Sequence, residues 1–173
     1  MTGTPADSAV TPFDEVYRDH ADAVFRFCAS QLRNLAVAED VTADVFASAF
    51  AAYPGARPDP DGVRPWLFRI ARNAVIDQYR RDGRRRTLLV RLGRDRDYSS
   101  SVETDAERRG AIEAIVAALQ MLGERDRQLV GLRTAAGLSF AEVGAVLGMK
   151  EQSAKVATHR ALAKLRARLE GTR

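Results

Sequence analysis

A pair of carboxylates is the first feature of this 173-residue chain whose spacing could support chemistry. Asp40 and Asp44 lie four residues apart, so on a helix they share one face, and Glu39 precedes them. Paired carboxylates can act in acid–base catalysis or bind a metal ion. No histidine lies nearby, and the chain has no other oxygen-rich cluster. We therefore expect no catalytic or metal-binding residues, and we interpret Glu39, Asp40 and Asp44 as a face for a basic protein partner. A capping role at a helix start remains open for Glu39.

A block of arginines follows, and it reverses the charge of the chain. Residues 1–63 carry a net charge of −6, residues 64–96 carry +8 and residues 97–173 carry +2. Arginines beside aromatic and amide side chains suit single-stranded nucleic acid, where phosphates need donors and bases need stacking partners. The candidate residues are Arg69, Arg72, Asn73, Tyr79, Arg80 and Arg81. In the alternative interpretation the arginines only solvate a surface, whereas Trp66 and Tyr79 belong to the core.

The C-terminal part has the pattern of a helix-turn-helix motif. Ser139 and Glu142 have the spacing of a capping box, and Gly148 stands where a helix end favours a left-handed residue. A basic segment follows, and residues 149–173 carry a net charge of +5. Side chains in the first turns of such a helix reach base edges in the major groove. The candidate DNA-binding residues are Gln152, Ser153, Lys155, His159, Arg160 and Lys164. A basic, solvated helix in an ordinary bundle is the alternative.

Helical periodicity positions all these residues, and no segment alternates as a β-strand does. The expected helices cover residues 12–28, 37–53, 65–86, 124–136, 139–147 and 150–169. A further helix is expected to follow the capping-box spacing of Thr104 and Glu107 and to end near residue 123. Prolines and glycines crowd residues 54–64, which predicts a loop. We predict an all-α fold of two small helical domains, residues 11–86 and 104–170, joined by a flexible linker over residues 87–103.

The apolar stripes of these helices predict the core. The candidates in the first domain are Phe13, Val16, Tyr17, Val24, Cys28, Val37, Val41, Val45, Ala49, Tyr53, Trp66, Leu67, Ile70, Ala71, Ala74 and Val75. His20 lies on or near the first stripe and is most simply a core residue as well.

Composition excludes several classes of protein. No apolar run approaches the roughly 20 residues of a membrane span, and residues 1–10 lack the apolar stretch of a signal peptide. A single cysteine excludes an internal disulfide, and two histidines cannot complete a zinc site. The chain has neither a glycine-rich phosphate loop nor a nucleophile elbow. We expect a soluble, cytoplasmic protein that is not an enzyme, needs no cofactor and does not insert into a membrane.

Five sequence strings resemble a known family, the bacterial RNA polymerase sigma factors of the extracytoplasmic-function (ECF) group. Two strings are similar to its second conserved region, namely AEDVTADVF at residues 38–46 and WLFRIARN at residues 66–73. Three are similar to its fourth region, namely LGERDR at 122–127, GLSFAEV at 137–143 and HRA at 159–161. The resemblance covers about residues 11–169, with the regions in the family's order.

The resemblance implies promoter recognition in complex with core RNA polymerase. The helix bearing Asp40 and Asp44 would bind the clamp coiled coil of the largest polymerase subunit. The loop at 54–64 and the helix from Pro65 would capture and open the minus-ten element of promoter DNA, flipping a base into a pocket. The linker would thread toward the RNA exit channel, and the last helix would read the minus-thirty-five element. The sequence leaves open whether an anti-sigma factor binds the chain.

The chain also departs from the family pattern, and a second function stays open. Ala43-Asp44 replaces the usual Gln-Glu, Gly123 replaces a common proline, and Val156-Ala157 replaces a frequent Ser-Arg pair. The alternative function is a stand-alone helix-turn-helix regulator of transcription that does not touch polymerase. The acidic helix discriminates between the two, because a simple regulator has no need for it.

Overall fold

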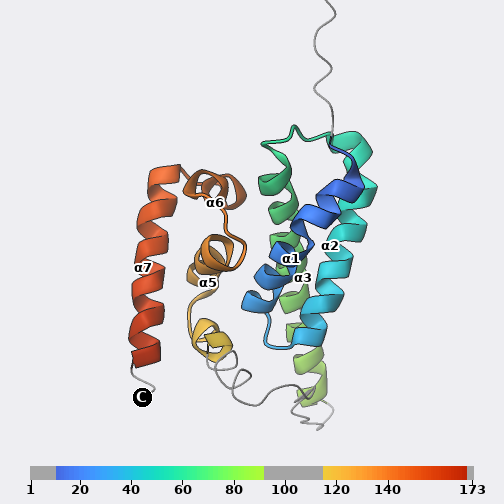
Figure 1. Ribbon diagram of the computed structural model, residues 1–173. Coiled ribbons are helices and arrows are strands. Elements are labelled where there is room, and N and C mark those ends of the chain that lie inside the picture. Colours follow the sequence, from blue (N-terminus) through green and yellow to red (C-terminus); the bar gives the residue numbers. More distant parts are fainter. Residues whose placement is uncertain (1–10, 92–114, 171–173) are drawn as a thin grey trace, which may run out of the picture.

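The chain folds into two clusters of helices that lie side by side (Figure 1). The computed structural model describes residues 11–91 and 115–170, with the side chains of residues 86 and 88–91 left aside. Within these ranges every regular element is helical, which confirms the all-α prediction. The first cluster contains α1 (Phe13–Gln31), α2 (Leu35–Ala56) and α3 (Val63–Arg91). The second contains α5 (Glu124–Val130), the π-helical turn η1 (Gly131–Ala135), α6 (Phe140–Leu147) and α7 (Glu151–Glu170).

The apolar stripes form the core of the first cluster largely as the periodicity predicts. Ten of the stripe residues are buried, namely Val16, Val24, Cys28, Val41, Val45, Ala49, Tyr53, Leu67, Ala71 and Val75. Phe13, Val37, Trp66, Ile70 and Ala74 pack against this core while partly exposed. Tyr17 is the exception, because 54% of its surface is exposed. Its ring instead rests edge-on against Phe46 of α2, at a centroid distance of 4.7 Å.

Helices α2 and α3 both extend into the proline-rich stretch at residues 54–64, which was expected to be a loop. Pro54 lies inside the last turn of α2, which ends at Ala56, and Arg57 closes the helix in the left-handed conformation with φ 38°. Pro65 falls in the first turn of α3, where a missing backbone N–H breaks no helical hydrogen bond. The connection between α2 and α3 is therefore shorter than the predicted loop at 54–64.

The second cluster has the helix-turn-helix geometry that the sequence indicates. The Ser139 hydroxyl accepts from the backbone N–H of Glu142 (3.2 Å), and the Glu142 carboxylate accepts from the backbone N–H of Ser139 (2.7 Å). This capping box starts α6, and Gly148 ends it with φ 67°. Residues 115–120 are also helical and precede α5. The expected single helix over 124–136 is instead α5 followed by the wider turn η1.

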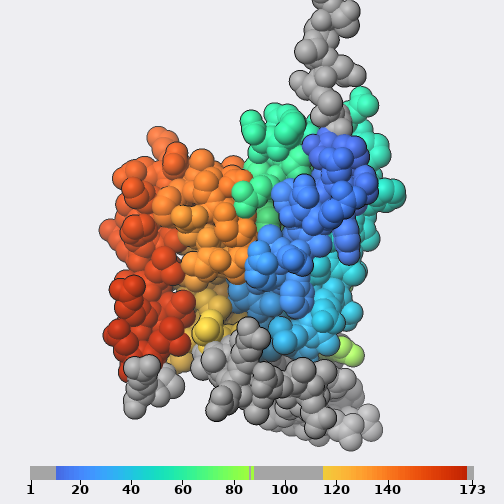
Figure 2. Space-filling view, in the orientation of Figure 1, coloured from blue at the N-terminus to red at the C-terminus, as the bar shows by residue number. Residues whose placement is uncertain are grey.

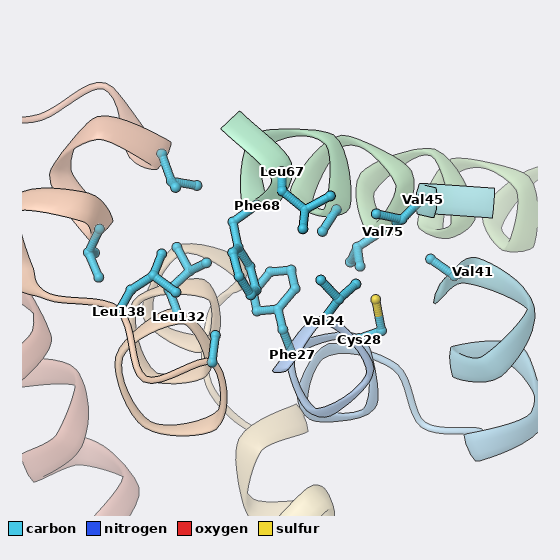
Figure 3. Packing of buried hydrophobic residues seen from close by; sticks show 14 of the residues in the cluster. Val24, Phe27, Cys28, Val41, Val45, Leu67, Phe68, Val75, Leu132 and Leu138 are labelled. Carbon is cyan, nitrogen blue, oxygen red and sulfur yellow. The ribbon is translucent and has the colours of Figure 1, made fainter. Parts of the chain in front are cut away.

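The two clusters share one hydrophobic core rather than standing apart. Phe27 of α1 and Phe68 of α3 meet edge to face at 5.8 Å, and both are fully buried. Figure 3 shows Leu132 of η1 and Leu138 of the following turn directed toward these two rings. The space-filling view shows no gap between α5–α6 and the first cluster (Figure 2). The packing joins segments about a hundred residues apart, so no local sequence pattern announces it.

The boundaries of the expected domains fall mostly beyond the described residues. Most of the linker at 87–103 lies there, as does the start of the domain at 104–170. α3 continues to Arg91, past the expected boundary at residue 86.

Gly144 sets how closely the two helices of the helix-turn-helix motif approach, and it provides a test of this packing. A Cβ at Gly144 would lie 2.5 Å from the backbone carbonyl oxygen of Met149, which cannot move aside as a side chain would. We expect Gly144→Ala to lower the free energy of unfolding by about 1–3 kcal/mol, the usual cost of overpacking. Urea unfolding followed by circular dichroism measures this loss.

Gly83 offers the matched control. It lies within α3, and a Cβ there would meet no atom within 4 Å. Gly83→Ala should therefore stabilise the protein by about 0.5–1 kcal/mol through helix propensity alone. Equal effects of the two substitutions would show that the turn tolerates a side chain at Gly144.

Candidate nucleic-acid and protein interfaces

The acidic face of α2 comprises Glu39, Asp40 and Asp44, and all three side chains are exposed. Asn34 caps the start of this helix by accepting from the backbone N–H of Val37 (3.2 Å), so Glu39 is not needed as the cap. Asp44 lies 3.9 Å from the guanidinium of Arg81 on α3, and both side chains are more than half exposed. Such a pair contributes little to stability, so both groups remain available to a partner.

A shallow apolar groove runs between α1 and the C-terminal half of α2. It is lined by Phe13, Asp14, Tyr17, Arg18, Ala21 and Phe50. Phe50 is 66% exposed, although its ring meets Phe13 edge-on at 5.2 Å. Glu39 and Phe50 are eleven residues apart, or three helical turns, so both lie on the flank of α2 that faces α1. Helical spacing predicts Tyr17 in the core, and no sequence pattern singles out Phe50.

The arginine face of α3 comprises Arg69, Asn73 and Arg80, which are exposed and recur at helical spacing. The Arg69 side chain donates to the backbone carbonyl of Pro65 (3.3 Å), and Arg80 pairs with Asp77 (3.3 Å). These are local contacts on a solvated surface, so they are easily exchanged for contacts with phosphate. Arg81 lies next to this face, on the side toward Asp44.

Arg72 and Tyr79, from the same predicted set, point instead toward the second cluster. The Arg72 side chain donates to the amide oxygen of Gln128 on α5 (2.9 Å). The Tyr79 hydroxyl donates to the backbone carbonyl of Gln31, and the guanidinium of Arg127 lies 5.2 Å from the centre of its ring. Burial raises the pKa of Tyr79, which keeps the phenol protonated as a donor. The six predicted residues thus divide between two sides of α3.

The basic face of α7 comprises Gln152, Ser153, Lys155, His159, Arg160 and Lys164, and all six side chains are exposed. The opposite side of α7 packs on the cluster through Ala154, Thr158 and Ala161, which are buried. The His159 ring lies 5.8 Å from the ring of Phe140, and Lys164 forms an ion pair with Asp126 at 2.5 Å. Packing on one side therefore presents the polar residues together on the other.

Arg64 and Glu142 form a contact between the clusters that the sequence analysis missed. Arg64 of α3 pairs with Glu142 of α6 (3.2 Å), and it also donates to the carbonyls of Ala136 (3.3 Å) and Gly137 (3.2 Å). His20 is half-buried near both residues, and its pKa is lowered by burial and then by the charge of Arg64. The capping-box spacing singles out Glu142 in the sequence. Its partner Arg64, however, lies 78 residues away, beyond the reach of any local pattern.

The described residues offer no site for a metal ion or a reactive thiol. Within them, no three histidine, cysteine, aspartate or glutamate side chains gather closely enough to hold a metal. Burial raises the pKa of the Cys28 thiol to about 11, so it stays protonated at neutral pH and is a poor nucleophile. None of the helices in residues 11–91 and 115–170 is both long enough and apolar enough to cross a membrane.

Comparison with protein families finds a matching family model for each of the two clusters. The family model of Sigma-70 region 2 matches residues 16–85, and that of Sigma-70 region 4 matches residues 112–165. The first match contains the acidic face and the arginine face, and the second contains the helix-turn-helix.

Characterised relatives match along nearly the whole chain. The ECF RNA polymerase sigma factor SigE of Mycolicibacterium smegmatis is 33% identical over 94% of this chain, which spans 63% of that relative. The RNA polymerase sigma factor CarQ of Myxococcus xanthus is 31% identical, with 92% of this chain and 90% of CarQ aligned.

Among solved structures, the sigma factor RpoE of Bartonella quintana has the same architecture. RpoE, solved in complex with the anti-sigma factor NepR, superposes with a TM-score of 0.73 at 25% identity. The superposition covers 93% of this chain and 98% of RpoE. With two family regions in order and relatives along its length, the chain belongs to the ECF group of RNA polymerase sigma factors, as its sequence strings predicted.

Proposed function

We propose that this sigma factor binds core RNA polymerase through the acidic face of α2 and directs it to promoters through α3 and α7. In this proposal α3 captures and opens the minus-ten element, and α7 reads the minus-thirty-five element. The sigma factor supplies binding energy and sequence recognition, while catalysis of RNA synthesis belongs to the polymerase. Because polymerase and promoter DNA are its partners, we place the protein in the cytoplasm with them.

The observation that carries this proposal is the separation of charge onto three exposed helix faces. Glu39, Asp40 and Asp44 are exposed on α2, Arg69, Asn73 and Arg80 on α3, and the basic residues on α7. A carboxylate face repels nucleic acid and attracts a basic protein surface, whereas arginines and lysines do the reverse. One chain can therefore hold a protein and DNA at once without the two competing for a surface.

The apolar groove between α1 and the C-terminal half of α2 would extend the proposed polymerase site. Phe50 and Tyr17 are large and exposed, and Glu39 lies on the same flank of α2 as Phe50. Interfaces commonly combine an aromatic anchor with charges at the rim. The carboxylates would orient the polymerase coiled coil, and the aromatic rings would supply apolar contact.

The proposed minus-ten site combines phosphate donors with groups that recognise bases. Arg69, Arg80 and Arg81 can neutralise phosphates, and the Asn73 amide can hydrogen-bond a base edge. The proposed site also includes Arg72 and Tyr79, although in this structure Arg72 donates to Gln128 and the guanidinium of Arg127 lies over the Tyr79 ring. A base held out of the duplex costs unstacking energy, which such contacts offset.

The proposed minus-thirty-five site lies in the first turns of α7. Gln152 and Ser153 are short polar residues suited to base edges, whereas Lys155, Arg160 and Lys164 suit phosphates. Val156 is 41% exposed, where the family frequently has serine, and its methyl groups suit the methyl group of thymine. Ala157 is only partly exposed and packs against the core.

A stand-alone regulator fits these features less well. Such a protein needs only the helix-turn-helix, whereas the match to Sigma-70 region 2 spans residues 16–85. An anti-sigma factor is a further proposed partner, supported by the RpoE structure, which contains the anti-sigma factor NepR.

Charge reversal at Asp40 tests the proposed polymerase site. Asp40 is exposed and, unlike Asp44, does not face Arg81, so the change leaves that ion pair intact. We expect Asp40→Arg to abolish co-purification with core polymerase and run-off transcription, because like charges at an interface cost several kcal/mol. Asp22→Arg on α1 makes the same charge change on another helix and should leave both unchanged. Normal transcription by Asp40→Arg would place the docking site elsewhere.

Templates with a premelted minus-ten region test the role of α3 in strand opening. Asn73→Ala and Arg80→Ala should lower transcription strongly from duplex promoters but little from templates already mismatched there. A premelted template removes the cost of unpairing and flipping a base, a few kcal/mol. Run-off assays on the two templates measure the ratio. A loss of the same size on both would assign these residues to general affinity.

Salt dependence of DNA binding tests whether Lys155 contacts a phosphate. In that case Lys155→Ala weakens binding equally on matched and scrambled minus-thirty-five elements, and the salt slope falls by about 1. A base contact would instead cost roughly 1–3 kcal/mol on the matched element alone. Arg166→Ala, the same loss of charge three turns further along α7, should change the slope less. An unchanged affinity and slope for Lys155→Ala would place Lys155 away from the DNA.

A further inference from the structure

We propose that a cavity near the end of α1 binds a nucleotide through its phosphate groups. A free phosphate ion offers the same anionic chemistry, and the experiment below distinguishes the two. The cavity is separate from the acidic face of α2 and the basic face of α7. Of the residues assigned above to polymerase or DNA, it shares only Tyr79. The proposal therefore goes beyond promoter recognition and does not depend on it.

The cavity lies where the connection between α1 and α2 meets α3 and α5. Its volume is about 340 Å³, within the range of roughly 300–1,000 Å³ that is typical of small-molecule sites. The polar residues of its lining are Arg33, Asn34, Tyr79, Asp82, Gln120 and Arg127. Its size suits a small ligand, and its lining is rich in hydrogen-bond donors.

Arg127 is the residue that points to an anionic ligand. Its side chain is 8% exposed, yet it forms no ion pair with any carboxylate of the described residues. One Nη donates to the backbone carbonyl of Leu122 (3.3 Å), and the guanidinium lies 5.2 Å from the centre of the Tyr79 ring. The Nε–H is buried and has no hydrogen-bond partner within the described ranges. A buried cation without a counter-ion is costly, so an anion in the cavity would stabilise it.

Arg33 adds a second guanidinium to the same lining. It is exposed, and it too has no ion pair among residues 11–91 and 115–170. Burial raises the pKa of Tyr79, and the positive charges of Arg127 and Arg33 both oppose this rise, so both guanidiniums lie near the phenol. Guanidinium groups are well suited to phosphate, because their planar array of N–H donors matches its oxygens.

The N-terminal end of α2 contributes further positive potential. Its N-cap Asn34 and its first-turn residue Val37 both line the cavity. No acidic residue in that first turn offsets the partial positive charge of the helix end. The Asn34 side-chain oxygen accepts from the backbone N–H of Val37 (3.2 Å), which leaves its NH₂ group as a donor.

Asp82 favours a nucleotide over a free phosphate ion. It supplies the only carboxylate among the described residues of the lining. Its Oδ1 accepts from the Gln78 amide (3.0 Å), so its second oxygen can accept another hydrogen bond. A carboxylate repels a bare phosphate, but it accepts well from a ribose hydroxyl or a base amino group. A nucleotide can use both the guanidiniums and Asp82, whereas a phosphate ion can use only the guanidiniums.

Calorimetric titration of the full chain with adenosine 5′-diphosphate and with inorganic phosphate tests the site. We expect the nucleotide to saturate one site and to bind about tenfold more tightly than phosphate. Arg33→Gln should weaken the binding of both probes about tenfold, through loss of one charge-assisted hydrogen bond. Arg125→Gln is the matched control, because Arg125 is an exposed arginine of α5 outside the lining. It should change either affinity by less than about twofold.

Two further variants separate binding from folding. Asp82→Ala should weaken binding of the nucleotide and tighten binding of inorganic phosphate, because it removes an acceptor and a repulsive charge together. A general loss of stability would not produce opposite changes. Arg127→Met keeps the apolar stem but removes the guanidinium, and it should abolish binding of both probes. Where circular dichroism shows that Arg127→Met misfolds, Arg33→Gln and Asp82→Ala decide the question.

Three outcomes would overturn the proposal. The first is that neither probe binds the wild-type chain. The second is equal weakening by Arg33→Gln and Arg125→Gln, which would show attraction to net positive charge without a site. The third is displacement of the bound nucleotide by an equal concentration of a single-stranded DNA oligonucleotide, which would assign the cavity to nucleic acid. The titrations need neither polymerase nor promoter, so they decide the matter whether or not run-off transcription supports the proposed function.

Discussion

The contact of Leu132 and Leu138 with the rings of Phe27 and Phe68 is the constraint on which the rest of the arrangement depends. All four residues are fully buried, although they come from α1, α3, η1 and the turn after it. Burial of large apolar side chains is the main favourable term in such packing. Because this core is shared, the orientation of each cluster determines which polar groups of the other meet water and which meet protein.

This shared core explains why residues of one helix have different surroundings. On α3, Phe68 enters the core, so residues about one turn away, such as Arg72, must lie at its edge against α5. Arg69 and Asn73 lie further round the helix and stay in solvent. A single helix thus carries a solvated arginine face and a covered one. The same division occurs on α2, where Phe46 and Asp44 are close in sequence but differ in exposure.

Backbone motifs and tertiary contacts also reinforce each other in this fold. Glu142 caps its own helix and at the same time neutralises Arg64 of the first cluster. Gly144 and Gly131 each permit a close approach, one within the helix-turn-helix and one between the clusters. Local motifs of the second cluster therefore also determine how closely that cluster packs on the first. The half-buried His20, near Arg64 and Glu142, lies at the same junction.

The amino-acid sequence by itself determined the helices, their caps and most of the core of the first cluster. Periodicity placed Val24, Val45 and Leu67 inside, and capping spacing placed Ser139 at the start of α6, because these effects act over a few residues. It also indicated the family, through strings that hold charged and apolar residues in a specific order.

Only the tertiary structure decided how these elements meet. By its sequence the arginine block is predicted to form one surface, because periodicity describes a helix without saying which neighbour covers each side. The contacts of Arg72 with Gln128 and of Arg127 with Tyr79 join residues far apart in the chain, and no spacing rule reaches that far. Tyr17 fails for the related reason that helical spacing puts it on the apolar stripe of α1, whereas in the fold its ring meets Phe46 edge-on and 54% of its surface stays exposed.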